Sequence, residues 1–114
     1  MSSPYSEIRG SQRRSVSWRS RIYTVGKQFL EAKVTDISTG GCGFVCDSAL
    51  RNGTELNMSI TVQEVRDRMQ VHMIHVRGIV RWSIMGGAGV KHGFQFVEID
   101  DFATELILDW VRAQ

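Results

Sequence analysis

The segment FLEAKVTDISTGGCGFVC, residues 29–46, contains two runs typical of β-strands on either side of a glycine-rich break. The runs are residues 29–37 and 42–46, and both are rich in apolar side chains. The glycines of Thr39-Gly40-Gly41 make the break between them tight. The segment therefore predicts two neighbouring antiparallel strands, and the rest of the chain continues this pattern in both directions.

Four further runs with strand character flank this segment. They are residues 16–25, 56–62, 69–82 and 91–97. Turns are expected at Gly26-Lys27, Asn52-Gly53 and residues 86–89, a charged connection at 63–68, and a bend at Gly78. In the longest run we expect Ile74, Val76, Val80 and Trp82 on one side. The pattern predicts an antiparallel meander that curls toward a barrel.

Only the last stretch of the chain has a helical period. Its apolar repeat consists of Phe102, Ala103, Leu106, Ile107 and Trp110. Asp100 or Asp101 is placed to cap the N-terminus of this helix. We expect the helix to cover one end of the barrel, and the alternative is an amphipathic helix that binds a partner protein.

Composition indicates one domain whose N-terminal third is basic. The chain has 114 residues, of which 42% are hydrophobic, which suits one core. Residues 1–34 hold seven Lys and Arg against two acids, and residues 35–114 hold seven against ten. We therefore expect a flexible basic leader at 1–15 and the barrel with its helix at 16–114. No apolar run reaches the roughly 20 residues that span a bilayer, so we expect a cytoplasmic protein without membrane insertion.

Neither the cysteines nor the histidines form a pattern typical of a metal or catalytic site. Cys42 and Cys46 lie four apart on one predicted strand, about 13 Å from each other, and are expected to be core residues. His72 and His75 should point to opposite faces of their strand, and His92 stands alone. We expect no enzyme activity, no metal and no cofactor.

The turn after residue 37 carries a possible ligand site. Asp36 is a carboxylate acceptor for the N1–H and N2–H₂ edge of a guanine, and Ser38 is a hydroxyl for phosphate or base. Gly40 and Gly41 would let backbone N–H groups approach a ligand closely. The alternative is an Asx-turn, in which Asp36 only satisfies its own backbone.

Arginines in the leader supply the charge that this turn lacks. Arg9 and Arg13 form an Arg-x-x-x-Arg motif whose guanidinium groups suit phosphate or the O6/N7 edge of guanine. Arg14 lies beside Arg13, and either is a candidate for the closer ligand contact. A second copy of the motif, Arg77 and Arg81, falls within a predicted strand, where the arginines are most simply solvated.

These motifs resemble those of the PilZ domain family, bacterial receptors for cyclic di-GMP. The family pattern is Arg-x-x-x-Arg, a strand hairpin, then (Asp/Asn)-x-Ser-x-x-Gly, and five residues match it: Arg9, Arg13, Asp36, Ser38 and Gly41. Residues 78–82 and 93–100 also resemble the family, so the similarity covers about residues 9–112. Departures fall near the second arginine, at Gln12 and residues 14–17, where family members often have a proline or an aromatic residue.

The resemblance implies a six-stranded antiparallel β-barrel with a C-terminal helix. It also implies cyclic di-GMP as the ligand, often bound as an intercalated dimer, with the leader folding over it. The candidate ligand-binding residues are Arg9, Arg13, Arg14, Asp36, Ser38, Gly40 and Gly41.

Three functional hypotheses follow, in decreasing order of support. The first is a receptor that binds cyclic di-GMP, changes conformation and signals to a partner protein. The second is a ligand-independent adaptor of the same fold. The third is a small barrel that binds nucleic acid through Trp18, Trp82 and Trp110, which the confinement of basic charge to one end argues against.

Overall fold

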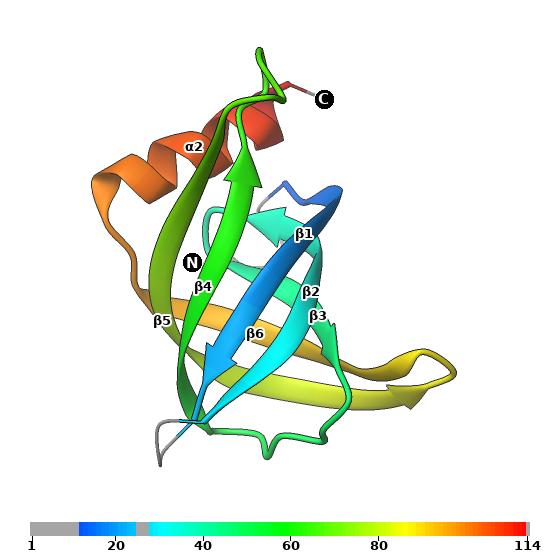
Figure 1. Ribbon diagram of the computed structural model, residues 1–114. Coiled ribbons are helices and arrows are strands. Elements are labelled where there is room, and N and C mark those ends of the chain that lie inside the picture. The colour runs from blue at the N-terminus through cyan, green and yellow to red at the C-terminus, as the bar shows by residue number, and fades with distance from the viewer. Residues whose placement is uncertain (1–11, 25–27, 114) are drawn as a thin grey trace.

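The computed structural model describes residues 12–24 and 28–113. These residues form six strands and one helix. The strands are β1 (Arg14–Tyr23), β2 (Phe29–Ser38), β3 (Gly41–Cys46), β4 (Glu55–Gln63), β5 (Val71–Gly86) and β6 (Gly89–Glu98), and the helix is α2 (Asp101–Arg112). The expected barrel with a C-terminal helix is confirmed (Figure 1).

The strands close in the order β1-β2-β3-β6-β5-β4, and every neighbouring pair is antiparallel. The barrel is therefore not the single meander expected from the sequence. Two three-stranded meanders, β1-β2-β3 and β4-β5-β6, meet where β3 pairs with β6 and where β1 pairs with β4. Closure of this kind pairs strand edges that would otherwise be open.

Strand limits differ from the sequence-based limits by a few residues. β1 begins at Arg14, two residues earlier than expected, because Arg14 pairs with Ile37 and Ser15 with Asp36 on β2. Cross-strand pairing of this kind leaves no trace in the polar sequence of residues 14–15. The expected turn at Gly26-Lys27 lies outside the described residues, although the strands on either side of it are antiparallel neighbours.

The inner face of the barrel is apolar, as the alternation predicts. Trp18 and Ile22 of β1 are buried, as are Ile74, Val76 and Val80 of β5. Trp82 is the exception, since 41% of its surface is exposed. The β5–β6 register shifts between Val80 and Trp82, which moves Trp82 off the inner face. Its indole instead lies on Gly93, where a Cβ would meet the ring nitrogen.

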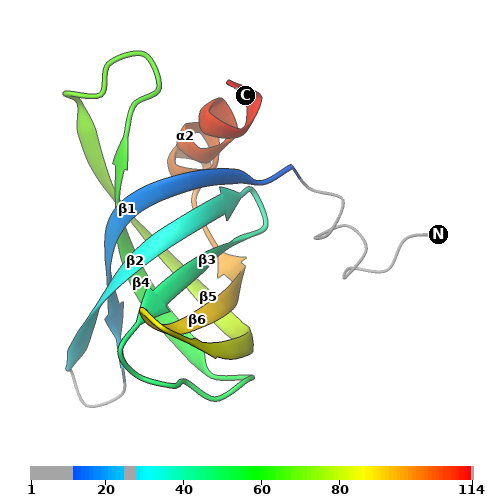
Figure 2. The ribbon, with the colours of Figure 1, turned by 90° about the vertical axis from the view of Figure 1, so that its right-hand side faces the viewer.

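Helix α2 covers one end of the barrel (Figure 2). The Asp100 side chain caps its N-terminus by accepting from the Ala103 amide at 2.8 Å. Its buried residues are Ala103, Leu106, Ile107, Trp110 and Val111. Phe102 was expected in the buried stripe but is 56% exposed, because it lies at the margin of that stripe and contacts the ring of His72.

Cys42 and Cys46 are buried and free, in agreement with a core role. Burial raises the pKa of the Cys42 thiol, and the nearby Asp36 carboxylate raises it further. Both cysteines are therefore uncharged near neutral pH. Within residues 12–24 and 28–113 the only helix, α2, is too short to reach across a bilayer.

Candidate functional site

Arg13 lies directly against the Asp36 turn. Its Nε donates to Asp36 Oδ1 at 3.0 Å, its Nη2 lies 2.9 Å from the same oxygen, and its Nη1 donates to Ser38 Oγ at 3.3 Å. The pairing of Ser15 with Asp36 places the start of β1 beside this part of β2. Residues 23 and 25 positions apart in the sequence thus form one cluster.

The Asp36 carboxylate is held between two cations and the backbone of β3. Lys91 Nζ lies 3.8 Å from Oδ2, on the side away from the Arg13 contact with Oδ1. Gly43 is the cross-strand partner of Asp36, and a Cβ at residue 43 would overlap Oδ2. The carboxylate therefore uses space that any side chain on residue 43 would occupy.

The hydroxyl of Ser38 organises the turn itself. Ser38 Oγ donates to the Gly41 carbonyl at 3.2 Å and accepts from the Gly40 amide at 3.3 Å. A Cβ on Gly41 would overlap the Phe94 carbonyl oxygen, so the close approach of β3 to β6 requires glycine there. In the Asx-turn alternative, Asp36 would make the hydrogen bonds within this turn. Ser38 makes them instead, and the Asp36 carboxylate faces Arg13 and Lys91.

Arg14 points to a different place from Arg13. Its Nη1 donates to the Trp110 carbonyl at 2.9 Å, and its guanidinium lies 5.1 Å from the centroid of the Trp110 ring. Successive residues of a strand face opposite sides, which separates the two guanidinium groups. Arg13 is thus the arginine at the Asp36 turn in the described part of the chain, and Arg9 lies outside that part.

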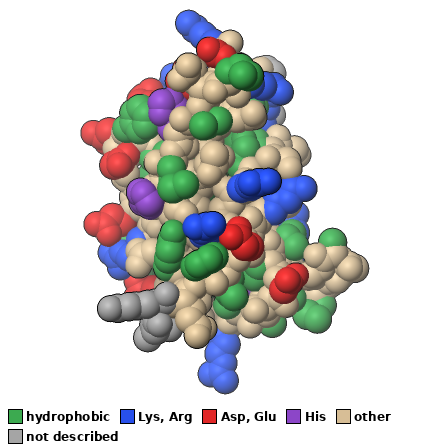
Figure 3. Space-filling model, viewed as in Figure 1, with side chains coloured by type: hydrophobic (Ala, Val, Ile, Leu, Met, Phe, Trp, Pro, Cys, Tyr) green, Lys and Arg blue, Asp and Glu red, His purple; other side chains and the backbone are tan. Residues whose placement is uncertain are grey.

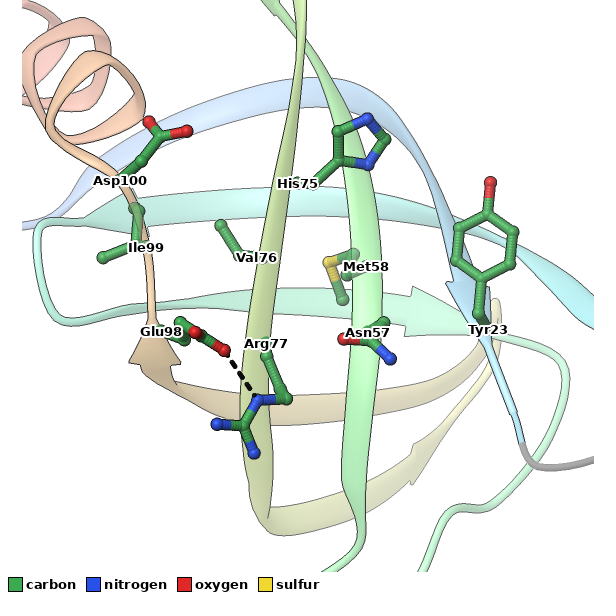
Figure 4. Close-up of a pocket in the computed structure, with 9 residues that line it drawn as sticks. All are labelled: Tyr23, Asn57, Met58, His75, Val76, Arg77, Glu98, Ile99 and Asp100. Carbon is green, nitrogen blue, oxygen red and sulfur yellow. Dashed lines mark hydrogen bonds and ion pairs between the residues drawn. The ribbon is translucent and has the colours of Figure 1, made fainter.

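The second Arg-x-x-x-Arg copy takes part in cross-strand pairs. Arg77 lies 3.0 Å from Glu55 and 3.0 Å from Glu98, and Arg81 donates to Gln95 at 2.6 Å. These arginines are exposed to solvent, as the sequence suggested, and they also connect β5 to its neighbouring strands. Figure 4 shows Arg77 and Glu98 in a cleft of about 430 Å³ on the outer face of the barrel. None of the candidate ligand-binding residues lines this cleft.

The Arg13 cluster is suited to recognising a ligand that carries both acceptors and donors. Asp36 presents acceptor oxygens, and Arg13 presents a planar fork of donors that is partly exposed. Within the described residues, no group of three or more His, Cys, Asp and Glu side chains lies close enough to hold a metal ion. The groups that this cluster presents are hydrogen-bond donors and acceptors of opposite charge.

Two residues of this site were not predicted from the sequence. Gly43 accommodates Asp36, and Lys91 places a second positive charge beside it. Lys91 reaches the site because β6 pairs with β3, a neighbour distant in the sequence. The only sequence signal for Gly43 was a third glycine close after Gly40 and Gly41, within a predicted strand.

Comparisons with known proteins identify the family of this chain and the solved structures that have a similar fold. The family model described as PilZ domain matches residues 7–113. A search of the curated proteins gives no match. Among solved structures, the inhibitor of motility MotI/DgrA from Bacillus subtilis has a TM-score of 0.76 at 17% identity, covering 92% of this chain and 50% of its own.

Two structures of YcgR from Escherichia coli are also similar. The structure of YcgR in complex with c-di-GMP has a TM-score of 0.73 at 13% identity, over 91% of this chain and 44% of its own. The PilZ domain of YcgR with c-di-GMP has a TM-score of 0.63 at 15% identity, over 91% of this chain and 88% of its own. This chain thus spans about half the length of MotI/DgrA and of the longer YcgR structure.

Proposed function

Because this chain belongs to the PilZ domain family, we propose that it is a cytoplasmic receptor for cyclic di-GMP, and not an enzyme. The observation that carries the proposal is the contact of Arg13 with both Asp36 and Ser38. These residues belong to the two motifs that resemble the family, and they converge from distant parts of the sequence. The YcgR structures with c-di-GMP, which have the same fold, support this choice of ligand.

The chemistry of the cluster fits guanine and phosphate together. Guanine carries acceptors at O6 and N7, which match a guanidinium fork, and donors at N1 and N2, which match a carboxylate. Arg13 and Asp36 neutralise each other in the structure. We propose that the ligand exchanges this ion pair for its own contacts, with Asp36 binding the guanine edge and Arg13 binding phosphate or O6/N7.

The remaining candidate residues extend this site. Gly40 and Gly41 place backbone groups beside Ser38, and Lys91 adds positive charge next to Asp36. We propose that Arg9 and the rest of the leader close over the bound nucleotide, with Arg14 as a further contact. Closure of the leader changes the surface of the protein, and a partner protein reads this change.

Isothermal titration calorimetry with cyclic di-GMP tests the proposal, with cyclic di-AMP as the matched control. We expect heat of binding at protein concentrations on the order of tens of micromolar, and far weaker binding of cyclic di-AMP, because adenine lacks the N1–H and N2–H₂ donors assigned to Asp36. Absence of heat from a folded protein would remove the proposal and favour the ligand-independent adaptor. Equal affinity for the two nucleotides would remove the role assigned to Asp36.

A further inference from the structure

The pairing of β1 with β4, which closes the barrel, covers only part of each strand. Residues 20–23 of β1 pair with residues 57–60 of β4, from Ser20 with Ile60 to Tyr23 with Asn57. Residues 14, 15, 18 and 19 of β1 pair with β2 alone, with a register shift between Ser15 and Trp18, and residues 61–63 of β4 pair with β5 alone. We call this open part of the barrel, formed by residues 14–19 and 61–63, the seam. In Figure 1 the two strands diverge toward α2 along it.

Two clefts lie along β1, one at the seam and one that extends over the part where β1 pairs with β4. The first, of about 450 Å³, runs between residues 14–18 on one side and Gln63, Arg68 and Trp110 on the other. The second, of about 470 Å³, lies beside it and has residues 19–21 on one side and Ser59, Thr61 and Met73 on the other. Their lining residues on β1, 14–18 and 19–21, are consecutive, and we call the two neighbouring clefts the groove.

The seam leaves strand edges without a neighbouring strand. Within residues 12–24 and 28–113, the register of β1 with β4 begins at Ser20, and residues 14–19 have no cross-strand partner on β4. Part of this edge contacts α2, since Arg14 donates to the Trp110 carbonyl at 2.9 Å and the Trp18 and Trp110 ring centroids lie 5.5 Å apart. One edge group of β4 is satisfied by a side chain, since the Gln63 carbonyl accepts from Trp110 Nε1 at 2.6 Å. Where the seam begins, the buried hydroxyl of Ser20 has no hydrogen-bond partner. Free edges of this kind bind an extended segment that adds as a further strand.

The charge along the groove is positive. Four arginines line the two clefts against one acid, Glu31, which is paired with Arg21. Among the described residues, Arg19 and Arg68 have no carboxylate partner. Figure 3, drawn from the same side as Figure 1, shows basic side chains over the middle and right of this face. The groove therefore complements negative charge, and Met73 at its side, 61% exposed, offers apolar contact.

We propose that the seam binds an extended, acidic segment of a partner protein, which pairs its backbone with the free edge of β1. At about 3.3 Å per residue, residues 14–19 offer an edge of roughly 20 Å, the length of an ordinary strand. This surface would be the site at which the partner protein of the proposed function binds, and its role in signalling rests on that proposed function. Arg14 at one end of the seam is also a proposed nucleotide contact, whereas Arg19, Arg68 and Thr61 make no contact with Asp36 or Ser38, so binding at the seam is tested without cyclic di-GMP.

Selection from a random peptide library tests the seam. Peptides of about 12 residues, longer than the roughly 20 Å edge requires, are displayed on phage and selected against the wild-type protein without nucleotide. We expect enriched peptides to be acidic and free of proline at their centre. By nuclear magnetic resonance, a synthetic copy should slow amide exchange at residues 15–19 and shift the resonances of 61–63.

Two charge-reversal variants distinguish binding at the seam from non-specific electrostatic attraction of an acidic peptide to the protein. Arg19→Glu should weaken binding of the selected peptide by about tenfold or more, since it reverses a charge inside the groove. Arg51→Glu makes the same change of charge on an exposed loop and should leave the affinity unchanged. Both variants should still bind cyclic di-GMP as the wild type does, so failure of the seam and failure of the receptor proposal are distinguishable.

Three results would overturn the inference. The first is a selection that enriches no peptide, or only peptides without acidic residues. The second is a selected peptide that perturbs amides elsewhere, or that loses as much affinity with Arg51→Glu as with Arg19→Glu. The third is concentration-dependent self-association of the protein that Arg19→Glu abolishes, which would identify a second copy of this chain as the occupant.

Discussion

Gly43 stands directly across the β2–β3 ladder from Asp36, and the Asp36 carboxylate occupies the space that a Cβ on residue 43 would need. The side chain of Asp36 is thereby kept close to β3, between Arg13 and Lys91. A residue outside the recognised motif thus decides where the carboxylate of that motif can lie.

We predict that Gly43→Ala weakens cyclic di-GMP binding while the barrel stays folded. The added methyl group forces Asp36 to another rotamer, and we expect an affinity loss of about tenfold or more, equivalent to about 1.4 kcal/mol. Calorimetry and thermal unfolding measure the two effects. Gly87→Ala is the matched control, because a Cβ there meets open space. Unchanged affinity in Gly43→Ala would contradict the role assigned to Gly43.

Arg13→Ala and Asp36→Ala should each weaken cyclic di-GMP binding by about ten- to a hundredfold. This follows from roughly 1.5–3 kcal/mol for each lost hydrogen bond to a charged group. Both side chains are partly exposed, so the barrel should remain folded in both variants. The measurement is calorimetry, with circular dichroism to verify folding. Wild-type affinity in either variant would show that this cluster is not the nucleotide site.

Arg77→Ala should leave cyclic di-GMP affinity unchanged and have a small effect on stability. Its ion pairs with Glu55 and Glu98 are well exposed, and such pairs contribute about 0–1 kcal/mol each. We expect urea unfolding to show a loss within this range that shrinks at high salt, because salt screens exposed charges. If Arg77→Ala weakened nucleotide binding as Arg13→Ala does, the second Arg-x-x-x-Arg copy would be the functional one.

Stability should fall below about pH 6.5 because of His92, whose unperturbed pKa lies near that value. His92 is buried, stacks on Phe44, and accepts from the Leu50 amide through Nε2 at 3.1 Å. Burial lowers its pKa, only partly offset by a backbone hydrogen bond with Val90. Below about pH 6.5 the unfolded chain takes up a proton that the folded chain does not. The stability contribution is therefore present above this pH and is lost as the pH falls toward the lower pKa of the folded state.

Urea unfolding between pH 7.5 and 5.5 measures this effect. We expect a slope of at most about 1.4 kcal/mol per pH unit from one group, reduced in His92→Gln, which cannot titrate. His75→Gln, at an exposed position of β5, should retain the wild-type slope. A slope that persists in His92→Gln would assign the pH dependence to another group.

Local patterns predicted the features that depend on local geometry. Alternation identified the buried faces of the strands, and the helical period identified the face of α2 that packs on the barrel. Trp82 departs from its predicted face because a register shift with β6 interrupts the alternation. Such a shift depends on the partner strand, which the periodicity of one strand does not contain.

In the candidate site too, some residues could be predicted from local sequence and others only from strand pairing. Arg13, Asp36 and Ser38 were predicted from motifs, and the structure brings them together. The sequence left Arg13 and Arg14 equivalent, and only the strand geometry separates them. Gly43 and Lys91 owe their positions to cross-strand register, so they required the pairing of β2 with β3 and of β3 with β6.

A single peptide bond joins the arginine that touches the Asp36 turn to the arginine that touches the last turn of α2. Because peptide units are rigid and planar, a pull on one of these side chains that moves the backbone also displaces the other. Arg13 and Arg14 thus connect the end of β2 to the helix that covers the barrel by the shortest possible backbone path, and Trp110 is a natural fluorophore at the helix end of that path.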